Sequence, residues 1–175
     1  TLFDMQKAPM VDVVDPDGLV RSQAIATASG DFRITLNGAE TRRTLAGSFL
    51  AEGIGGTVQH IALATDDIFT TASILRESGF AALQLSPNYY DDLAARFELS
   101  QQLLERLRSA NILYDADQGG EYFQLYSQPL AGQMFLEIVE RRDGYSGYGA
   151  ANAPFRIAAQ KRMQTPKGIA VTENV

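Results

Sequence analysis

Apolar and polar residues alternate along the first part of the chain, with the period expected of strands that bury one face. Two turn signals, Asp15-Pro16-Asp17-Gly18 and Ser29-Gly30-Asp31, interrupt this alternation. The pattern therefore predicts three short strands, over residues 10–14, 19–27 and 32–37. Residues 41–50 are ambiguous and can form a short helix, and a flexible joint, Gly53-Ile54-Gly55-Gly56, follows them.

The rest of the chain mixes strand and helical periodicity. A strand over residues 57–65 precedes a helix that Asp66 or Asp67 can cap and Gly79 can end. A longer helical stretch over 89–110 contains Ser100 as a second candidate cap. The other predicted elements are a strand over 81–85, a turn at Gln118-Gly119-Gly120, strands over 121–128 and 134–142, and a helix over about 155–163 that ends before Pro166.

The order of these elements is that of an α+β protein with mainly antiparallel pairing. The first three strands mirror the last three strands of the second part, so a strand and a helix upstream of Met10 would complete a duplicated β-α-β-β-β unit. The chain begins with Thr1, which agrees with a missing upstream part. We expect a truncated first module, a second module with a helical insert at about 88–112, and a C-terminal helix and tail: residues 1–50, 51–150 and 151–175.

Composition narrows the class of function. The chain has 175 residues, 21 of them acidic and 15 basic, and its net charge of −6 argues against binding to nucleic acid or an anionic membrane. Cysteine is absent, which excludes disulfides, thiolate metal sites and a cysteine nucleophile. No apolar stretch approaches the length of a membrane span and no signal peptide is visible, so we expect a cytoplasmic protein.

The candidate chemistry centres on the single histidine, His60. Because side chains alternate along strands, His60, Gln124 and Glu137 each fall on a strand face among apolar or aromatic neighbours. In one curved sheet the three side chains can point into one cavity. A buried carboxylate is costly unless it is paired or metal-bound, and imidazole plus carboxylate suits Fe(II), Mn(II) or Zn(II). The opposite strand faces, such as that of Ile61 and Leu63, are predicted to lie under helices.

A purely structural interpretation of these residues stays open. His60 can be a hydrogen-bonded core residue, and Glu137 can pair with Arg141 or Arg142. The glycines of residues 144–149 superficially resemble a phosphate loop, but they lack the strand–loop–helix context that such a loop needs.

Five short runs form an ordered set of motifs. They are residues 55–68, Asn88-Tyr89-Tyr90-Asp91, Tyr122-Phe123-Gln124-Leu125-Tyr126, Phe135-Leu136-Glu137-Ile138-Val139, and Gly147-Tyr148-Gly149 followed by Asn152. Together they resemble the catalytic half of the 4-hydroxyphenylpyruvate dioxygenases. The resemblance implies the vicinal-oxygen-chelate fold, in which paired β-α-β-β-β modules surround a metal cavity.

The resemblance also implies a ligand set. In this family two histidines and one glutamate hold Fe(II). His60 matches the second histidine and Glu137 the glutamate, while the first histidine is expected upstream of Thr1. Mn(II), Mg(II) and Zn(II) are alternatives to Fe(II). Substrate-binding positions of the family are matched by Ser22, Asn37 and Gln124, and Tyr148 and Phe155 can close the pocket.

Some runs are more similar to a subgroup of bacterial fusion proteins. The family's Arg-Pro-Thr run is replaced by Ala131-Gly132-Gln133, and Ala153 and Pro154 displace the aromatic residue expected after Asn152. The runs at 17–22 and 147–154 resemble those of fusions in which a barrel precedes a dioxygenase-like half. These fusions resemble 3-dehydroshikimate dehydratases, whose dehydration chemistry lies in the barrel.

Three functions follow from these resemblances. The favoured one is the dioxygenase-like companion half of such a dehydratase, which keeps a metal site without oxygenation. The alternatives are an Fe(II)-dependent dioxygenase acting on an aromatic 2-oxo acid, and a non-catalytic binding or oligomerisation module. The expected partners are a small aromatic or cyclic carboxylic acid, an upstream barrel domain and further copies of the chain in a homo-oligomer.

Overall fold

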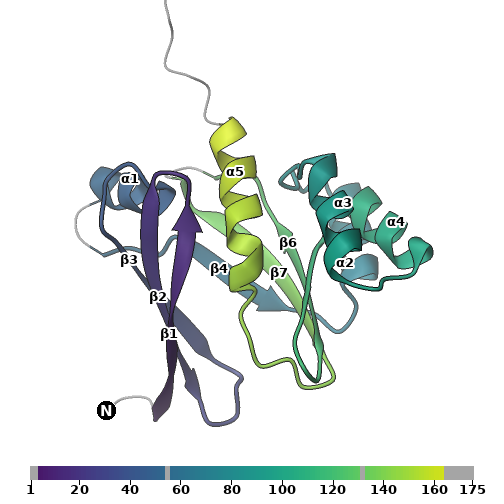
Figure 1. The fold of residues 1–175 in the computed structure, drawn as a ribbon, viewed down its shortest axis with the longest axis horizontal. Coiled ribbons are helices and arrows are strands. Elements are labelled where there is room, and N and C mark those ends of the chain that lie inside the picture. Colours follow the sequence, from purple (N-terminus) through teal and green to yellow (C-terminus); the bar gives the residue numbers. More distant parts are fainter. Residues whose placement is uncertain (1–3, 54–55, 131–132, 164–175) are drawn as a thin grey trace, which may run out of the picture.

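Two β-sheets lie side by side, and helices gather beyond the second of them (Figure 1). The structure is a computed structural model that describes residues 4–53, 56–130 and 133–163. In chain order its elements are β1 (Met5–Asp15), β2 (Gly18–Thr27), β3 (Arg33–Ala39), α1 (Leu45–Glu52), β4 (His60–Ala64), α2 (Ile68–Glu77), α3 (Pro87–Arg96), α4 (Gln101–Ala110), β5 (Leu113–Ala116), β6 (Glu121–Tyr126), β7 (Phe135–Arg142), a short 3₁₀ helix (Ala150–Asn152) and α5 (Ala153–Met163).

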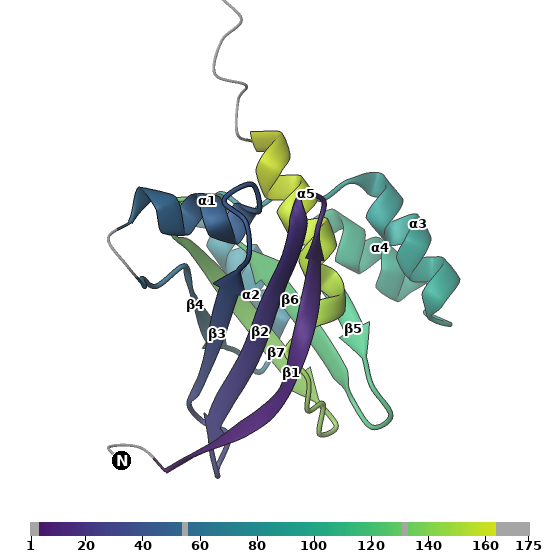
Figure 2. The same ribbon diagram turned by 60° about the vertical axis from the view of Figure 1, so that its left-hand side comes forward.

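The sheet topology confirms the α+β class and the mainly antiparallel pairing. The first sheet has the order β1-β2-β3 and is antiparallel throughout. The second has the order β4-β7-β6-β5, in which only β4 and β7 run parallel. Helix α5 contacts β1 and lies between the first sheet and the helices α3 and α4 (Figures 1 and 2). We call the side of the second sheet that is turned towards the first sheet and α5 the trough (Figures 1 and 2).

Local signals explain where the helices begin and end. Asp67 caps α2 and accepts hydrogen bonds from the backbone N–H groups of Phe69 at 3.0 Å and Thr70 at 3.1 Å. Ser100 caps α4, and Asn111 ends that helix in the left-handed conformation with φ of 54°. The caps predicted at Asp67 and Ser100 are confirmed.

One predicted strand is wrong. Residues 81–85 form no strand, because only Ala82 makes an isolated bridge, to Ser127. The strand beside β6 is instead β5, which the sequence analysis missed. Leu113 and Tyr114 are both buried, so β5 is covered on both faces and lacks the alternation of a half-buried strand.

The main core lies between the second sheet and the helices α2, α3 and α4. Ile68, Leu93, Leu107 and Phe123 are fully buried there. One predicted face is wrong here too: Ile61 and Leu63 of β4 are 45% and 52% exposed instead of lying under a helix. The reason is that β4 is an edge strand, whereas α2 packs over β6 and β7.

Some expectations fall outside the described residues. These are parts of the glycine joint at 54–55, the run at 131–132 and the tail after Met163, including Pro166. In the parts of the chain that the structure does describe, no helix combines the length and apolarity that a membrane crossing requires. The division into 1–50, 51–150 and 151–175 stays a prediction.

Candidate metal and substrate site

His60 and Glu137 meet on the trough side of the second sheet. β4 and β7 are parallel neighbours, and Glu137 lies opposite Ala62, so His60 is its diagonal neighbour on the same face. The His60 Nε2 and Glu137 Oε2 atoms are 3.3 Å apart. The imidazole stacks on the Phe135 ring, with centroids 5.0 Å apart and planes 7° apart, which fixes its orientation.

A hydrogen-bond network holds the Glu137 carboxylate in place. Gln124 Nε2 donates to Glu137 Oε1 at 2.8 Å, and the Tyr122 hydroxyl lies 3.5 Å from the same oxygen. The Gln124 side chain is in turn held by Asn152 Nδ2, which donates to Gln124 Oε1 at 2.8 Å and to the Tyr114 carbonyl at 3.2 Å. One carboxylate oxygen is therefore bound by protein donors, and the other faces His60.

The network also keeps the carboxylate ionised. Burial alone would raise the pKa of Glu137, but the hydrogen bond and charge of His60, with further hydrogen bonds from Gln124 and Tyr126, bring that pKa below its usual value. For the neighbouring Tyr122, burial and the Glu137 charge raise the pKa of the hydroxyl well above its usual value. Tyr122 consequently stays a neutral donor beside an anionic acceptor.

The donor set fits two ligands of a divalent metal ion. Ligand atoms that each lie about 2.1 Å from one ion are roughly 3.0–3.4 Å apart when the angle between them is about 90–110°. The His60–Glu137 separation of 3.3 Å falls in that range. Within residues 4–53, 56–130 and 133–163, no three His, Cys, Asp or Glu side chains are grouped to hold a metal.

Another buried carboxylate, Glu140, does not serve as a third ligand. Its Oε2 accepts the backbone N–H of Ile68 at 2.8 Å, and its Oε1 accepts from Arg142 Nε at 2.5 Å. Both contacts lie on the face of β7 that α2 covers. The pairing of Glu137 with Arg141 or Arg142, left open by the sequence, is not found either: Arg142 pairs with Glu140, and Arg141 lies over the Tyr122 ring.

Comparison with curated proteins shows which proteins this chain is similar to. No protein-family model matches the chain. Over 165 residues it is 44% identical to a 3-dehydroshikimate dehydratase of Pseudomonas aeruginosa, which covers 94% of this chain and 26% of that protein. Over 150 residues it is 31% identical to the 4-hydroxyphenylpyruvate dioxygenase of the same organism, which covers 85% of this chain and 42% of that protein. The chain thus spans about a quarter of the dehydratase and under half of the dioxygenase.

Solved structures agree with the sequence comparison. A xylose isomerase-like TIM barrel/4-hydroxyphenylpyruvate dioxygenase fusion protein matches with a TM-score of 0.72 and 42% identity, over 88% of this chain and 25% of that chain. A mutant 4-hydroxymandelate synthase from Streptomyces coelicolor matches with a TM-score of 0.81 and 27% identity, over 91% of this chain and 46% of that chain. This chain is a 4-hydroxyphenylpyruvate dioxygenase-like domain with the vicinal-oxygen-chelate fold. It resembles the C-terminal part of 3-dehydroshikimate dehydratase fusion proteins.

The dioxygenase-like domain places its predicted substrate residues unevenly around His60 and Glu137, which we call the metal pair because the sequence predicts them as metal ligands. Gln124 touches Glu137, as described above. Ser22 and Asn37 are cross-strand partners on β2 and β3, on the same face as Arg33, which reaches across to the Gly147 carbonyl at 2.8 Å. That face is therefore turned towards the second sheet, although no contact joins Ser22 or Asn37 to the metal pair within the described residues.

The two residues predicted to close the pocket, Tyr148 and Phe155, differ in their contacts. The Tyr148 hydroxyl is buried and has no hydrogen-bond partner among the described residues. Phe155 instead packs edge-on against Tyr89, with ring centroids 4.9 Å apart, and lies under the Arg96 guanidinium. The structure thus brings Gln124 to the metal pair and leaves Phe155 on the side of α3.

Sequence reasoning missed three residues of this domain's trough. Asn152 was noted only as part of a motif, but it positions Gln124. Arg33 and Arg141 both donate to the Gly147 carbonyl, at 2.8 Å and 3.5 Å. Arg33 follows a turn at the start of its strand, and no local pattern distinguishes it from a solvent-facing arginine.

Proposed function

We propose that this chain is the metal-binding, dioxygenase-like part of a fused 3-dehydroshikimate dehydratase, and that dehydration takes place elsewhere in that protein. The observation that carries the proposal is the His60–Glu137 pair, 3.3 Å apart, in a chain that is 44% identical to part of such a dehydratase. The upstream barrel, the third histidine ligand and the homo-oligomer belong to the proposal as well.

His60 and Glu137 would hold the metal, with Fe(II) as the ion implied by the family. Such an ion, when bound, supplies Lewis acidity and one-electron chemistry towards oxygen. The chain's own residues prepare its ligands: Phe135 orients the imidazole, and Gln124 fixes the carboxylate while leaving one oxygen available. Because two protein ligands bind more weakly than three, we expect this 175-residue chain alone to bind divalent metal weakly.

The ligand would be a small aromatic or cyclic carboxylic acid in the trough. Ser22, Asn37, Gln124 and Tyr148 would supply polar contacts to it. The partnerless Tyr148 hydroxyl supports this assignment, because a buried hydroxyl normally has a hydrogen-bond partner. For Phe155 the contact with Tyr89 favours a role in packing α5 over direct contact with the ligand.

Two assays on the full-length protein separate this function from oxygenation. One follows the dehydration of 3-dehydroshikimate, and the other follows oxygen uptake with 4-hydroxyphenylpyruvate after Fe(II) loading. We expect dehydration, and we expect His60→Ala to retain it because the metal pair does not carry that step. Gln59→Ala, a change at the neighbouring position, is the matched control. Rapid oxygen uptake coupled to carbon dioxide release, and abolished by His60→Ala, would overturn the proposal in favour of the dioxygenase.

A further inference from the structure

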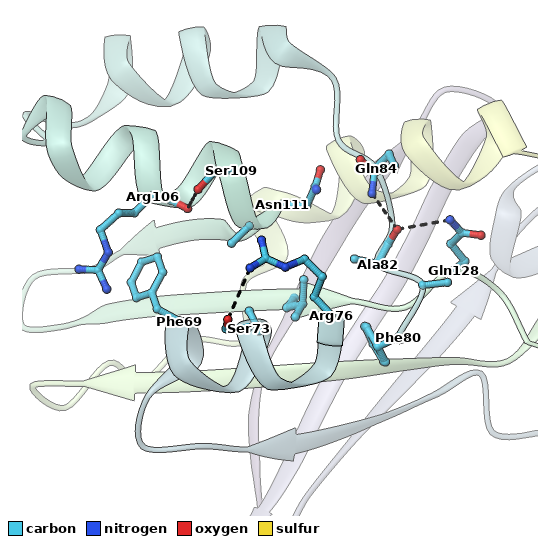
Figure 3. Close-up of a pocket in the computed structure, with 14 residues that line it drawn as sticks. Phe69, Ser73, Arg76, Phe80, Ala82, Gln84, Arg106, Ser109, Asn111 and Gln128 are labelled. Atoms are coloured by element: carbon cyan, nitrogen blue, oxygen red, sulfur yellow. Dashed lines mark hydrogen bonds between the residues drawn. The ribbon is translucent and has the colours of Figure 1, made fainter. Parts of the chain in front are cut away.

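A cavity lies on the other side of the four-stranded sheet from His60 and Glu137. It occupies about 420 Å³ between α2, α4 and the segment that follows α2 (Figure 3). Leu125 of β6 forms part of its wall, and this residue points to the face opposite Gln124. The helical insert that carries α4 therefore does more than cover the core, because it forms one side of a cavity large enough for a small ligand.

One part of the cavity wall is apolar. Phe69 and Phe80 stand at the two ends of the cavity, and Leu125 contributes from the sheet (Figure 3). Small side chains keep the space between them open: Ala72, Ala81, Ala82 and Ala110. A planar ring can pack against these apolar side chains, since aromatic residues favour stacked or edge-on contacts with rings.

Two arginines line the same space, and within the described residues neither is held by a carboxylate at ion-pair distance. The hydrogen bonds that Asp67 accepts lower its pKa most, and the Arg106 charge also helps to lower it, so that carboxylate acts on Arg106 from further away. In the described part of the chain, neither Arg76 of α2 nor Arg106 of α4 forms an ion pair. The Arg106 guanidinium lies 3.9 Å above the Phe69 ring, so its flat face is occupied and its N–H edge remains free. Arg76 makes only a long contact of 3.5 Å, to Ser73 Oγ. A guanidinium edge of this kind matches the two oxygens of a carboxylate.

Amide side chains complete the polar lining. Asn111 Oδ1 accepts the Leu85 backbone N–H at 3.2 Å, which leaves the Asn111 amide N–H groups as donors. Gln84 and Gln128 both donate to the Ala82 carbonyl, at 3.1 Å and 3.4 Å, which leaves their carbonyl oxygens as acceptors (Figure 3). These acceptors suit a hydroxyl group on a bound ring.

The end of a helix beside the cavity limits how much negative charge a bound ligand can carry. α4 ends at Ala110, which lines the cavity, so the partly negative carbonyl end of that helix lies at its margin, whereas α2 runs along the cavity from Phe69 to Arg76. This field opposes a multiply charged anion such as phosphate, whereas two arginines balance a single carboxylate. We propose that the cavity binds a small monocarboxylate with a flat, hydroxyl-bearing ring. The site is independent of the metal pair and of the proposed function.

Hydrogen–deuterium exchange of the full-length protein tests this site locally, with 4-hydroxybenzoate as the probe. We expect saturable protection of the α2 and α4 peptides, and we expect 4-hydroxybenzyl alcohol to bind about tenfold more weakly because it lacks the carboxylate. Arg76→Gln and Arg106→Gln should each weaken binding about tenfold, and Ser73→Phe should block it by filling the cavity. Arg42→Gln, at an exposed arginine outside the lining, and His60→Ala should leave the protection unchanged.

Several results would overturn the assignment. One is the absence of saturable protection in α2 and α4. A second is protection that persists in both arginine variants. A third is protection of the same size when inorganic phosphate or 4-hydroxybenzyl alcohol replaces 4-hydroxybenzoate at equal concentration. Arg76 and Arg106 are both exposed, but Arg106 also covers the Phe69 ring, so the unliganded exchange pattern of each variant serves as the check that the fold is intact.

Discussion

Replacement of Gln124 by Met is expected to loosen the strands that carry the metal pair. Gln124 is 1% exposed, and its amide makes three buried hydrogen bonds: to Glu137 Oε1 at 2.8 Å, to the Tyr126 hydroxyl at 2.6 Å, and from Asn152 at 2.8 Å. Methionine has a similar length but neither donates nor accepts in this geometry. The variant therefore removes the 2.8 Å donor from that oxygen and leaves the buried carboxylate with the contacts of Tyr122, at 3.5 Å, and of Tyr126.

The size of the effect follows from these contacts. A hydrogen bond to a charged group contributes about 1.5–3 kcal/mol, and each neutral one contributes about 1 kcal/mol. Two changes offset part of the loss. The methionine buries extra apolar surface, and Asn152 keeps its bond to the Tyr114 carbonyl. We therefore expect local opening of β6 and β7 to become easier by about 2–4 kcal/mol.

Hydrogen–deuterium exchange of the β6 and β7 amides measures this quantity in the full-length protein. The expected decrease in the free energy of local opening corresponds to amide exchange that is faster by about 30-fold to several hundredfold. Gln23→Met is the matched control, because Gln23 makes one long hydrogen bond, 3.3 Å, to the Ala8 carbonyl on the first sheet. An increase of less than about threefold in β6 and β7 would refute the claim that Gln124 supports the carboxylate.

Two further predictions concern Asp15 and Gly149, which lie outside the metal pair. Burial alone would raise the pKa of Asp15, but hydrogen bonds from Lys161 and from the N–H groups of Leu45 and Asp17 bring that pKa below its usual value. The ionised Asp15 therefore stabilises the folded state above the unfolded pKa near 3.8, and this stabilisation is lost as the pH falls through the folded pKa. Asp15→Asn should therefore cost about 2 kcal/mol at pH 7 and progressively less as the pH falls through the folded pKa of Asp15, measured by exchange of the α1 amides. Gly149→Ala should cost about 2–4 kcal/mol, because φ is +68° and a Cβ would collide with the buried glutamine amide beside it. Its control, Gly30→Ala, has φ of +80° with no atom within 4 Å of the added Cβ and should cost about 1 kcal/mol, so equal costs would refute the steric argument.

Local signals account for the elements that the sequence predicted. The first two turns, the Asp67 cap and the Ser100 cap each depend on residues within four positions of one another, and each lies where expected. The trough face of β6 and β7 was predictable for the same reason, since alternation is a local property. Membership of the dioxygenase-like family rests on ordered motifs and needed no structure.

Features that depend on distant parts of the chain were not predictable from pattern alone. β5 is buried on both faces, so its sequence carries no alternation. Ile61 and Leu63 are exposed because of the edge position of β4, which no local pattern encodes. The support of Glu137 by Asn152, through Gln124, joins residues on separate elements, and only the folded chain brings them together.

The metal content of the full-length protein tests the central claim most directly. We expect one divalent ion per chain after purification and dialysis, determined by elemental analysis. His60→Ala and Glu137→Gln should each lower the affinity at least about tenfold and release that ion, since each removes a ligand. Gln59→Ala and Glu98→Gln, which alter neighbouring or exposed side chains, should retain it. Undiminished stoichiometric metal in both ligand variants would contradict a metal site at His60 and Glu137.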